Sequence, residues 1–111
     1  MRERSSLPVV VMAKDEIDLD TAPSLECALA DALRAHREVV LDLTEVTFMD
    51  CAGLNVLLAV RKQADLHGRR FAVHGVGHRV ARLLELTGTD QYLTVVPEVF
   101  APAPEAEGEP R

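Results

Sequence analysis

The sequence predicts an α/β fold with a mostly parallel sheet of four to five strands and three to four helices. Apolar segments rich in β-branched residues alternate with segments whose apolar residues recur at helical spacing. The connections between them are short, which favours parallel strands joined by right-handed crossovers. A chain of 111 residues is long enough for one such domain with a single core.

The first strand is predicted at residues 9–13, because this run is β-branched and apolar. The polar residues 14–18 are expected to turn the chain. Thr21 is a good N-cap for a helix over residues 22–36, and Pro23 suits its first turn.

The second strand is predicted at residues 38–43, whose nearly continuous apolar content is typical of a strand covered on both faces. A second helix is predicted over residues 52–67 and ends at Gly68. Its apolar residues cover more than half of its circumference, whereas packing on a sheet needs a narrower stripe. Either a neighbouring helix covers the excess, or Leu54 and Leu58 border an exposed patch that meets another protein.

The remaining elements repeat the alternation of strand and helix. A strand at 71–74 is followed by a turn at 75–77, a helix at 78–87 that stops at Gly88, and a strand at 92–96.

The chain is expected to contain one folded domain between two short segments. Residues 1–7 form the short N-terminal segment and residues 8–99 the domain. Residues 100–111, an acidic tail rich in Pro, Ala and Glu, are expected to be disordered.

Composition limits the class of function. The formal charge of −6 argues against nucleic acid as a partner, because binding to phosphates needs a basic surface. No apolar run approaches the ~20 residues that cross a bilayer, and no secretory signal is recognised, so no membrane contact is expected. Cys27 and Cys51 are too few for a disulfide framework, which favours a cytoplasmic location.

The segment Asp50–Leu54 is the most informative part of the sequence. It lies between a predicted strand and a predicted helix N-terminus, where free backbone N–H groups can hold a phosphate or a small nucleophile. Cys51 in this position is a candidate redox sensor, although the adjacent Asp50 opposes formation of a thiolate.

Catalytic and metal sites are not predicted. Asp18, Asp42 and Asp50 resemble an acid–base set, but no paired histidine or nucleophilic serine accompanies them, so the protein is not expected to be an enzyme. Asp42, near a strand end, is expected to be hydrogen-bonded and structural. His74 and His78 are separated by a strand-to-helix break that removes helical alignment, so neither a metal nor another cofactor is expected.

A central motif in a fixed order and spacing consists of Leu41-Asp42-Leu43, Val46-Thr47-Phe48-Met49-Asp50 and Gly53-Leu54. In this order and spacing, these segments resemble the STAS domain of the anti-sigma factor antagonists. Further matches are Glu16-Ile17-Asp18 followed by Thr21-Ala22, and the late segment 80–88. The resemblance covers residues 8–98, but Asp15 stands where a glycine is common.

The resemblance implies a STAS-type fold and a bacterial transcription regulator. Members of the family bind an anti-sigma factor, usually a serine kinase of the histidine-kinase-like ATPase fold, and so free a sigma factor. The kinase phosphorylates a Ser or Thr directly after the motif Asp, and a phosphatase reverses this. By this resemblance, Asp50 is the motif Asp, Cys51 occupies the phosphoacceptor position and Ala52 follows it. Because neither side chain has a hydroxyl, the phosphorylation switch is expected to be missing.

The expected function is therefore an anti-sigma factor antagonist that acts as a monomer or weak dimer. Two alternatives stay open: a STAS-type ligand or redox sensor, and a STAS subunit of a transporter or sensory assembly. Thr47 and Thr89 also stay open as phosphate acceptors in place of Cys51. The predicted partner-binding surface consists of Asp18, Asp50, Cys51, Ala52, Gly53, Leu54 and Leu58.

Overall fold

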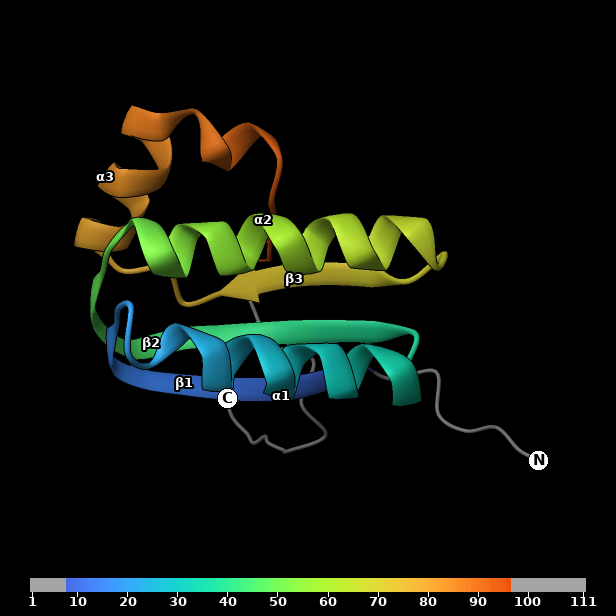
Figure 1. The fold of residues 1–111 in the computed structure, drawn as a ribbon. Helices are drawn as coiled ribbons and strands as arrows, with labels where there is room; N and C mark the ends of the chain where they lie inside the picture. The colour runs from blue at the N-terminus through green and yellow to red at the C-terminus, as the bar shows by residue number, and fades with distance from the viewer. Residues whose placement is uncertain (1–7, 97–111) are drawn as a thin grey trace, which may run out of the picture.

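A computed structural model describes residues 8–96, which form a sheet of four parallel strands in the order β1-β2-β3-β4. Figure 1 shows the alternation of strands and helices along this part of the chain. The predicted α/β class with a parallel sheet is confirmed, with three α-helices and a short 3₁₀ helix. The elements are β1 (Val9–Ile17), α1 (Ala22–Ala35), β2 (Glu38–Met49), α2 (Cys51–Leu66), β3 (Arg70–His74), α3 (His78–Thr87), η1 (Thr89–Gln91) and β4 (Thr94–Val96).

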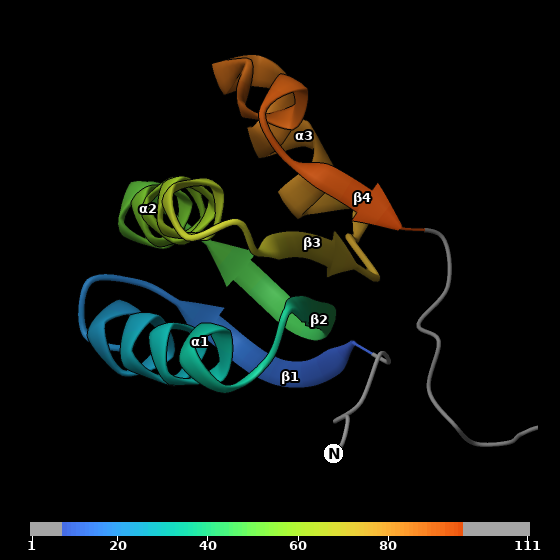
Figure 2. The same cartoon turned by 90° about the vertical axis from the view of Figure 1, so that its right-hand side faces the viewer.

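The helices of the described region pack on one face of the sheet. Each strand is added beside the previous one in the same direction, so right-handed crossovers place the connecting helices on a common side. Figure 2 shows α1 and α2 together on that side. Val80 and Leu84 of α3 join the same hydrophobic core, and no helix of residues 8–96 covers the opposite face.

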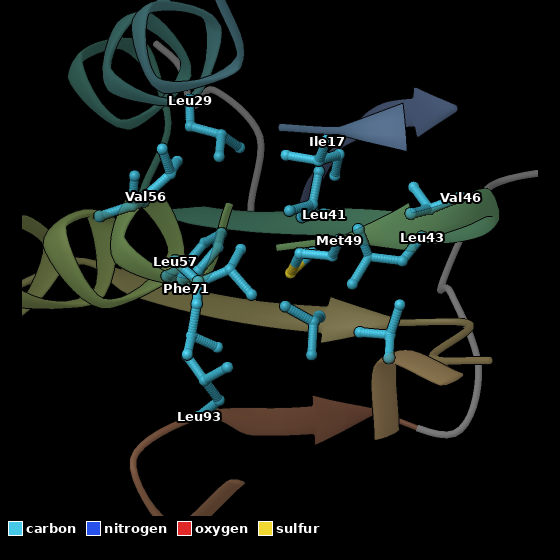
Figure 3. Packing of buried hydrophobic residues seen from close by; sticks show 14 of the residues in the cluster. Ile17, Leu29, Leu41, Leu43, Val46, Met49, Val56, Leu57, Phe71 and Leu93 are labelled. Carbon is cyan, nitrogen blue, oxygen red and sulfur yellow. The ribbon is translucent and has the colours of Figure 1, made fainter. Parts of the chain in front are cut away.

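The core forms where alternate residues of the strands meet the apolar faces of the helices. Leu41 and Leu43 of β2 are fully buried, as are Leu29 of α1 and Leu57 of α2. Figure 3 shows these side chains in one cluster between the sheet and the two helices. Burying a leucine side chain stabilises a fold by about 1.5–3 kcal/mol, so this layer fixes how the helices sit on the sheet.

Two strands are longer than the sequence predicts. The expected turn at residues 14–18 is wrong, because β1 continues to Ile17. The second strand, predicted to end at residue 43, continues to Met49. Pairing between them resumes after two register shifts and ends with Ile17 opposite Met49, so polar residues are held in the ladder by a neighbouring strand. Asp15 adopts a positive φ of 63° within this irregular stretch, which gives a physical reason for the glycine that is common there.

The wide apolar arc of α2 is explained by its neighbour. Helices α1 and α2 pack against each other, and Val56 of α2 is buried on the side toward Leu29 of α1 (Figure 3). Leu54 retains only 6% of its exposed surface, whereas Leu58 is half-buried. The expectation that Leu54 borders an exposed patch is therefore wrong, because Leu54 belongs to the buried core cluster.

Local signals at the helix ends are mostly confirmed. Gly88 ends α3 in the left-handed conformation with a φ of 74°, and Gly68 follows α2 with a φ of 65°. The last strand begins at Thr94 rather than residue 92, because η1 occupies residues 89–91. No helix in the described region is long and apolar enough to span a bilayer. The predicted segments 1–7 and 100–111 lie outside the described residues.

Candidate partner-binding site at the start of α2

Asp50 is the N-cap of α2 and uses its carboxylate on the helix backbone. Its Oδ1 accepts hydrogen bonds from the N–H groups of Ala52 at 2.8 Å and Gly53 at 3.4 Å. The Asp50 carbonyl oxygen accepts from Leu54 N at 3.1 Å. The expectation of free N–H groups at this helix start is therefore wrong for Ala52 and Gly53, since the aspartate already occupies their donors.

Gly53 is required by close packing beneath the turn. A Cβ at this position would lie 2.7 Å from Cγ of Met49 and 2.8 Å from Cγ2 of Ile17. Both neighbours are buried at the ends of β2 and β1. The absence of a side chain at Gly53 thus lets the first turn of α2 rest directly on the edge of the sheet.

A second aspartate-centred turn joins β1 to α1. Asp18 Oδ1 accepts from Asp20 N at 3.0 Å and from Thr21 N at 3.1 Å. Thr21 Oγ1 accepts from Asp18 N and donates to the Glu16 carbonyl oxygen, each at 2.9 Å. Thr21 is the N-cap residue of α1 as predicted, but its side chain stabilises the turn rather than the helix N–H groups.

The two turns lie side by side at the carboxyl edge of the sheet. Asp50 N donates a hydrogen bond to the Ile17 carbonyl oxygen at 3.1 Å, directly before Asp18. Five of the seven residues of the predicted partner-binding surface are at least partly accessible, and the other two are buried. Cys51 is exposed, Asp18, Asp50, Ala52 and Leu58 are half-buried, and Gly53 and Leu54 are buried.

Two apolar residues at this edge escaped the sequence prediction of the site. Leu19 is 77% exposed in the Asp18 turn, and Phe48 is 43% exposed near the end of β2. Leu19 belongs to no apolar pattern of a strand or helix, and an apolar residue outside such a pattern could have indicated a surface contact. Phe48 lies between the core residues Val46 and Met49 of β2. Because β2 pairs with β1 in an irregular register, alternation along the sequence does not predict which face of the sheet the Phe48 side chain occupies.

The alternative phosphate acceptors differ in access. Thr47 is exposed on β2, whereas Thr89 retains only 3% of its exposed surface. The Thr89 hydroxyl also lies 2.8 Å from the hydroxyl of Thr87, within hydrogen-bond distance. Of the two threonines, Thr47 is thus the one that a kinase can reach in the folded protein.

Other candidate residues have structural surroundings. Asp42 Oδ1 accepts from the N–H and hydroxyl of Thr44 at 2.9 and 2.5 Å, which confirms its expected structural role. A Cβ at Gly75 would lie 2.1 Å from Thr44 Oγ1, so the β3–α3 turn needs glycine there. Cys27 and Cys51 are both exposed free thiols. Within the described region, no group of three or more potential ligands is placed to hold a metal ion.

Comparisons with known proteins agree on one family. The STAS domain family model matches residues 1–101. The anti-sigma-B factor antagonist of Listeria monocytogenes is 31% identical over 97 residues, which cover 86% of this chain and 84% of that protein. The structure of an anti-sigma factor antagonist from Mycobacterium paratuberculosis is 33% identical, with a TM-score of 0.72 over 86% of this chain and 82% of that one. These names describe regulatory binding proteins rather than enzymes.

The fold is also shared with a more distant solved structure. The Bacillus cell fate determinant SpoIIAA in its phosphorylated form is 14% identical, with a TM-score of 0.64. The match covers 87% of this chain and 89% of that one, so the likeness extends over nearly the whole fold.

Proposed function

The chain belongs to the STAS domain family, and from this premise we propose that it is an anti-sigma factor antagonist without the usual phosphorylation switch. The names of its relatives support the general role. One observation carries the specific part: Cys51 is exposed at the start of α2, while the supporting frame of Asp50 and Gly53 is intact.

The proposed partner is an anti-sigma factor that is a serine kinase of the histidine-kinase-like ATPase fold. The contact surface is the edge formed by the Asp18 turn and the start of α2. It offers carboxylates beside the exposed side chains of Leu19 and Phe48, a mixture suited to a specific protein interface. Gly53 and Leu54 support this surface from below, and Leu58 extends it along α2.

The missing switch has a simple electrostatic meaning. A phosphate at position 51 would add about −1.5 to −2 charges beside Asp50 and near Asp18. The Ala52 and Gly53 N–H groups already donate to Asp50 and so do not compensate that charge. In a phosphorylated relative, this concentrated negative charge would therefore repel an acidic surface of the anti-sigma factor and lower the affinity of the complex. Cys51 and Ala52 provide no hydroxyl, so binding should not depend on kinase activity.

Binding and phosphorylation are tested together on the full chain. Purified protein is incubated with each candidate anti-sigma factor, with and without ATP, and both complex formation and intact mass are measured. Wild type should bind at least one candidate equally well in both conditions and gain no phosphate. Binding to none would refute the proposed role, whereas phosphate on wild type would refute the missing switch.

The Cys51→Ser variant tests whether the frame of the site is otherwise intact. Restoring a hydroxyl at this position should allow the kinase to add one phosphate and should make binding sensitive to ATP. Cys27→Ser is the matched control, because Cys27 is also exposed but lies on α1. Phosphate on both variants would show that the kinase does not select this turn.

A further inference from the structure

The carboxyl end of β1 and β2 is strongly acidic. Residues 14–20 and 45–50 contain six carboxylates against Lys14 alone. Within residues 8–96, none of these carboxylates lies within salt-bridge distance of a basic side chain. They belong to Asp15, Glu16, Asp18, Asp20, Glu45 and Asp50.

The opposite end of the sheet is basic. Figure 1 shows that α1 and α2 run side by side from the carboxyl end of the strands to their amino end, where both helices stop. Residues 31–38 and 61–70, at this amino end, contain six arginines and lysines against three carboxylates. All three carboxylates are already paired with arginine: Asp31 with Arg34, Asp65 with Arg61 at 3.1 Å, and Glu38 with Arg70 at 3.3 Å.

The basic residues in excess are not needed to satisfy the helix backbone. Cations near a helix C-terminus offset the helix dipole. At the end of α2, however, the N–H groups of His67, Gly68 and Arg69 already donate to its last carbonyl oxygens. No carboxylate of the described region lies within salt-bridge distance of Arg69. The amino end therefore has positive charge available to an acidic ligand.

A cleft of about 480 Å³ lies among these basic residues, between the ends of α1 and α2. Leu33 and Arg34 line it from α1, Gln63 lines it from α2, and His67 and Arg69 line it from the segment that follows. Of residues 8–96, no carboxylate contributes to the lining. The arginine side chains offer guanidinium donors and aliphatic stems, so the cleft suits carboxylates that flank an apolar side chain.

We propose that this basic cleft binds the Asp18–Asp20 turn of a second copy of the chain. The turn lies at the opposite, acidic end of the molecule and places Leu19 between two carboxylates. Leu19 is 77% exposed, and Asp20 is exposed beside it. In the contact, Leu19 packs on the aliphatic stems of the cleft, and the carboxylate of Asp20 pairs with Arg34 or Arg69.

Charge complementarity favours a second copy in spite of the net charge of the chain. The formal charge of −6 repels two copies at a distance, but salt screens exposed charges beyond ~8 Å at physiological ionic strength. The contacting ends, which are opposite in sign, then determine the interaction. Because the turn and the cleft are different surfaces, the contact is heterologous and joins copies head to tail.

Self-association would regulate access to the partner-binding surface. The contact covers Leu19, which the proposed contact with an anti-sigma factor also uses, so the two contacts exclude each other. This consequence rests on the proposed function, whereas the self-association itself does not. In a chain without a hydroxyl at position 51, protein concentration would then set how much antagonist is free to bind.

Sedimentation of the full chain measures the contact without any partner. Wild type, a chain of 12.2 kDa, should associate at about 20 mM salt and dissociate at about 0.5 M salt. Arg34→Glu combined with Arg69→Glu should weaken association at least tenfold. Arg79→Glu combined with Arg82→Glu changes the net charge equally at two exposed positions of α3 and should not weaken it. A wild type that stays monomeric up to about 1 mM at low salt, or an equal loss in this control, would overturn the proposal.

Mixing two variants tests the head-to-tail direction. R34E/R69E retains the turn, and Leu19→Ser combined with Asp20→Lys retains the cleft. Each alone should be monomeric, whereas their mixture should form a heterodimer that does not grow. Leu86→Ser combined with Glu85→Lys, an exposed pair on α3, should associate as wild type does. Absence of the heterodimer would overturn the proposal.

Circular dichroism checks the folding of each variant. If Arg69→Glu unfolds the chain, Arg34→Glu alone replaces the double variant, since the Arg34 side chain is 74% exposed.

Binding to the anti-sigma factor measures the regulatory consequence. At about ten times the self-dissociation constant, R34E/R69E should show an apparent affinity about threefold or more higher than wild type, because more of its turns are free. Equal affinities would overturn the mutual exclusion. No binding by either protein would refute the proposed function and would leave the sedimentation result unchanged.

Discussion

Two turns at the carboxyl edge of the sheet use the same chemistry with different support. Asp18 and Asp50 each accept two backbone N–H groups through one carboxylate oxygen. The Asp18 turn is largely exposed, whereas the Asp50 turn rests on Met49 and Ile17 through Gly53. A hydrogen-bonded turn that also packs on the core is expected to be more rigid than a turn held by hydrogen bonds alone. A partner would therefore meet one preorganised turn beside one more adaptable turn.

Adding a side chain beneath the rigid turn should have the largest effect. Gly53→Val is expected to lower the free energy of unfolding by about 3 kcal/mol, because the Cβ would overlap Met49 and Ile17. Gly77→Val is the matched control, since no heavy atom lies within 4 Å of its Cβ, and it should cost about 1 kcal/mol or less. Urea unfolding measures both, and equal losses would contradict the packing explanation.

Removing each carboxylate compares the two turns directly. Asp50→Ala should destabilise the protein by about 2 kcal/mol, because it removes the α2 cap in a partly buried site. Asp18→Ala breaks two backbone hydrogen bonds and a third from the Thr21 hydroxyl, but in an exposed turn, so it should cost only about 0.5–1 kcal/mol. Thermal unfolding measures the loss of stability in each of the two variants. A larger loss for Asp18→Ala would reverse the assignment of rigidity.

A negative charge on the rigid turn should weaken partner binding without loss of folding. Cys51→Glu is expected to reduce affinity for the anti-sigma factor about tenfold, or about 1.4 kcal/mol, since it places charge beside Asp50. Leu66→Glu introduces the same side chain at a 72% exposed position at the other end of α2 and should bind normally. Titration calorimetry measures the affinities, and equal effects would exclude a specific contact at position 51.

The adaptable turn should contribute a smaller amount through its exposed leucine. Leu19→Ser is expected to weaken binding about threefold and to leave stability within about 0.5 kcal/mol, because the side chain is 77% exposed in the free protein. Leu86→Ser, at a 75% exposed position on α3, serves as the control. A stability loss in Leu19→Ser equal to its binding loss would mean that the residue supports the turn rather than the partner.

The sequence determined the features that depend on neighbouring residues. Helical spacing, β-branched runs and glycine stops predicted the order of elements and the parallel sheet, and the acidic turn before Gly53 indicated the candidate site. Cys51 and Ala52 already showed that no hydroxyl is available there. Such signals act over a few residues, so they are visible without knowledge of the fold.

Only the tertiary structure decided the features that depend on distant partners. Pairing with β2 carried β1 through a polar stretch to Ile17, and packing in the core buried Leu54 and Val56 of α2. The bond from Asp50 N to the Ile17 carbonyl oxygen brought the two aspartate turns together. Strand register and helix packing are set by contacts between segments far apart in the chain, and local periodicity does not specify them.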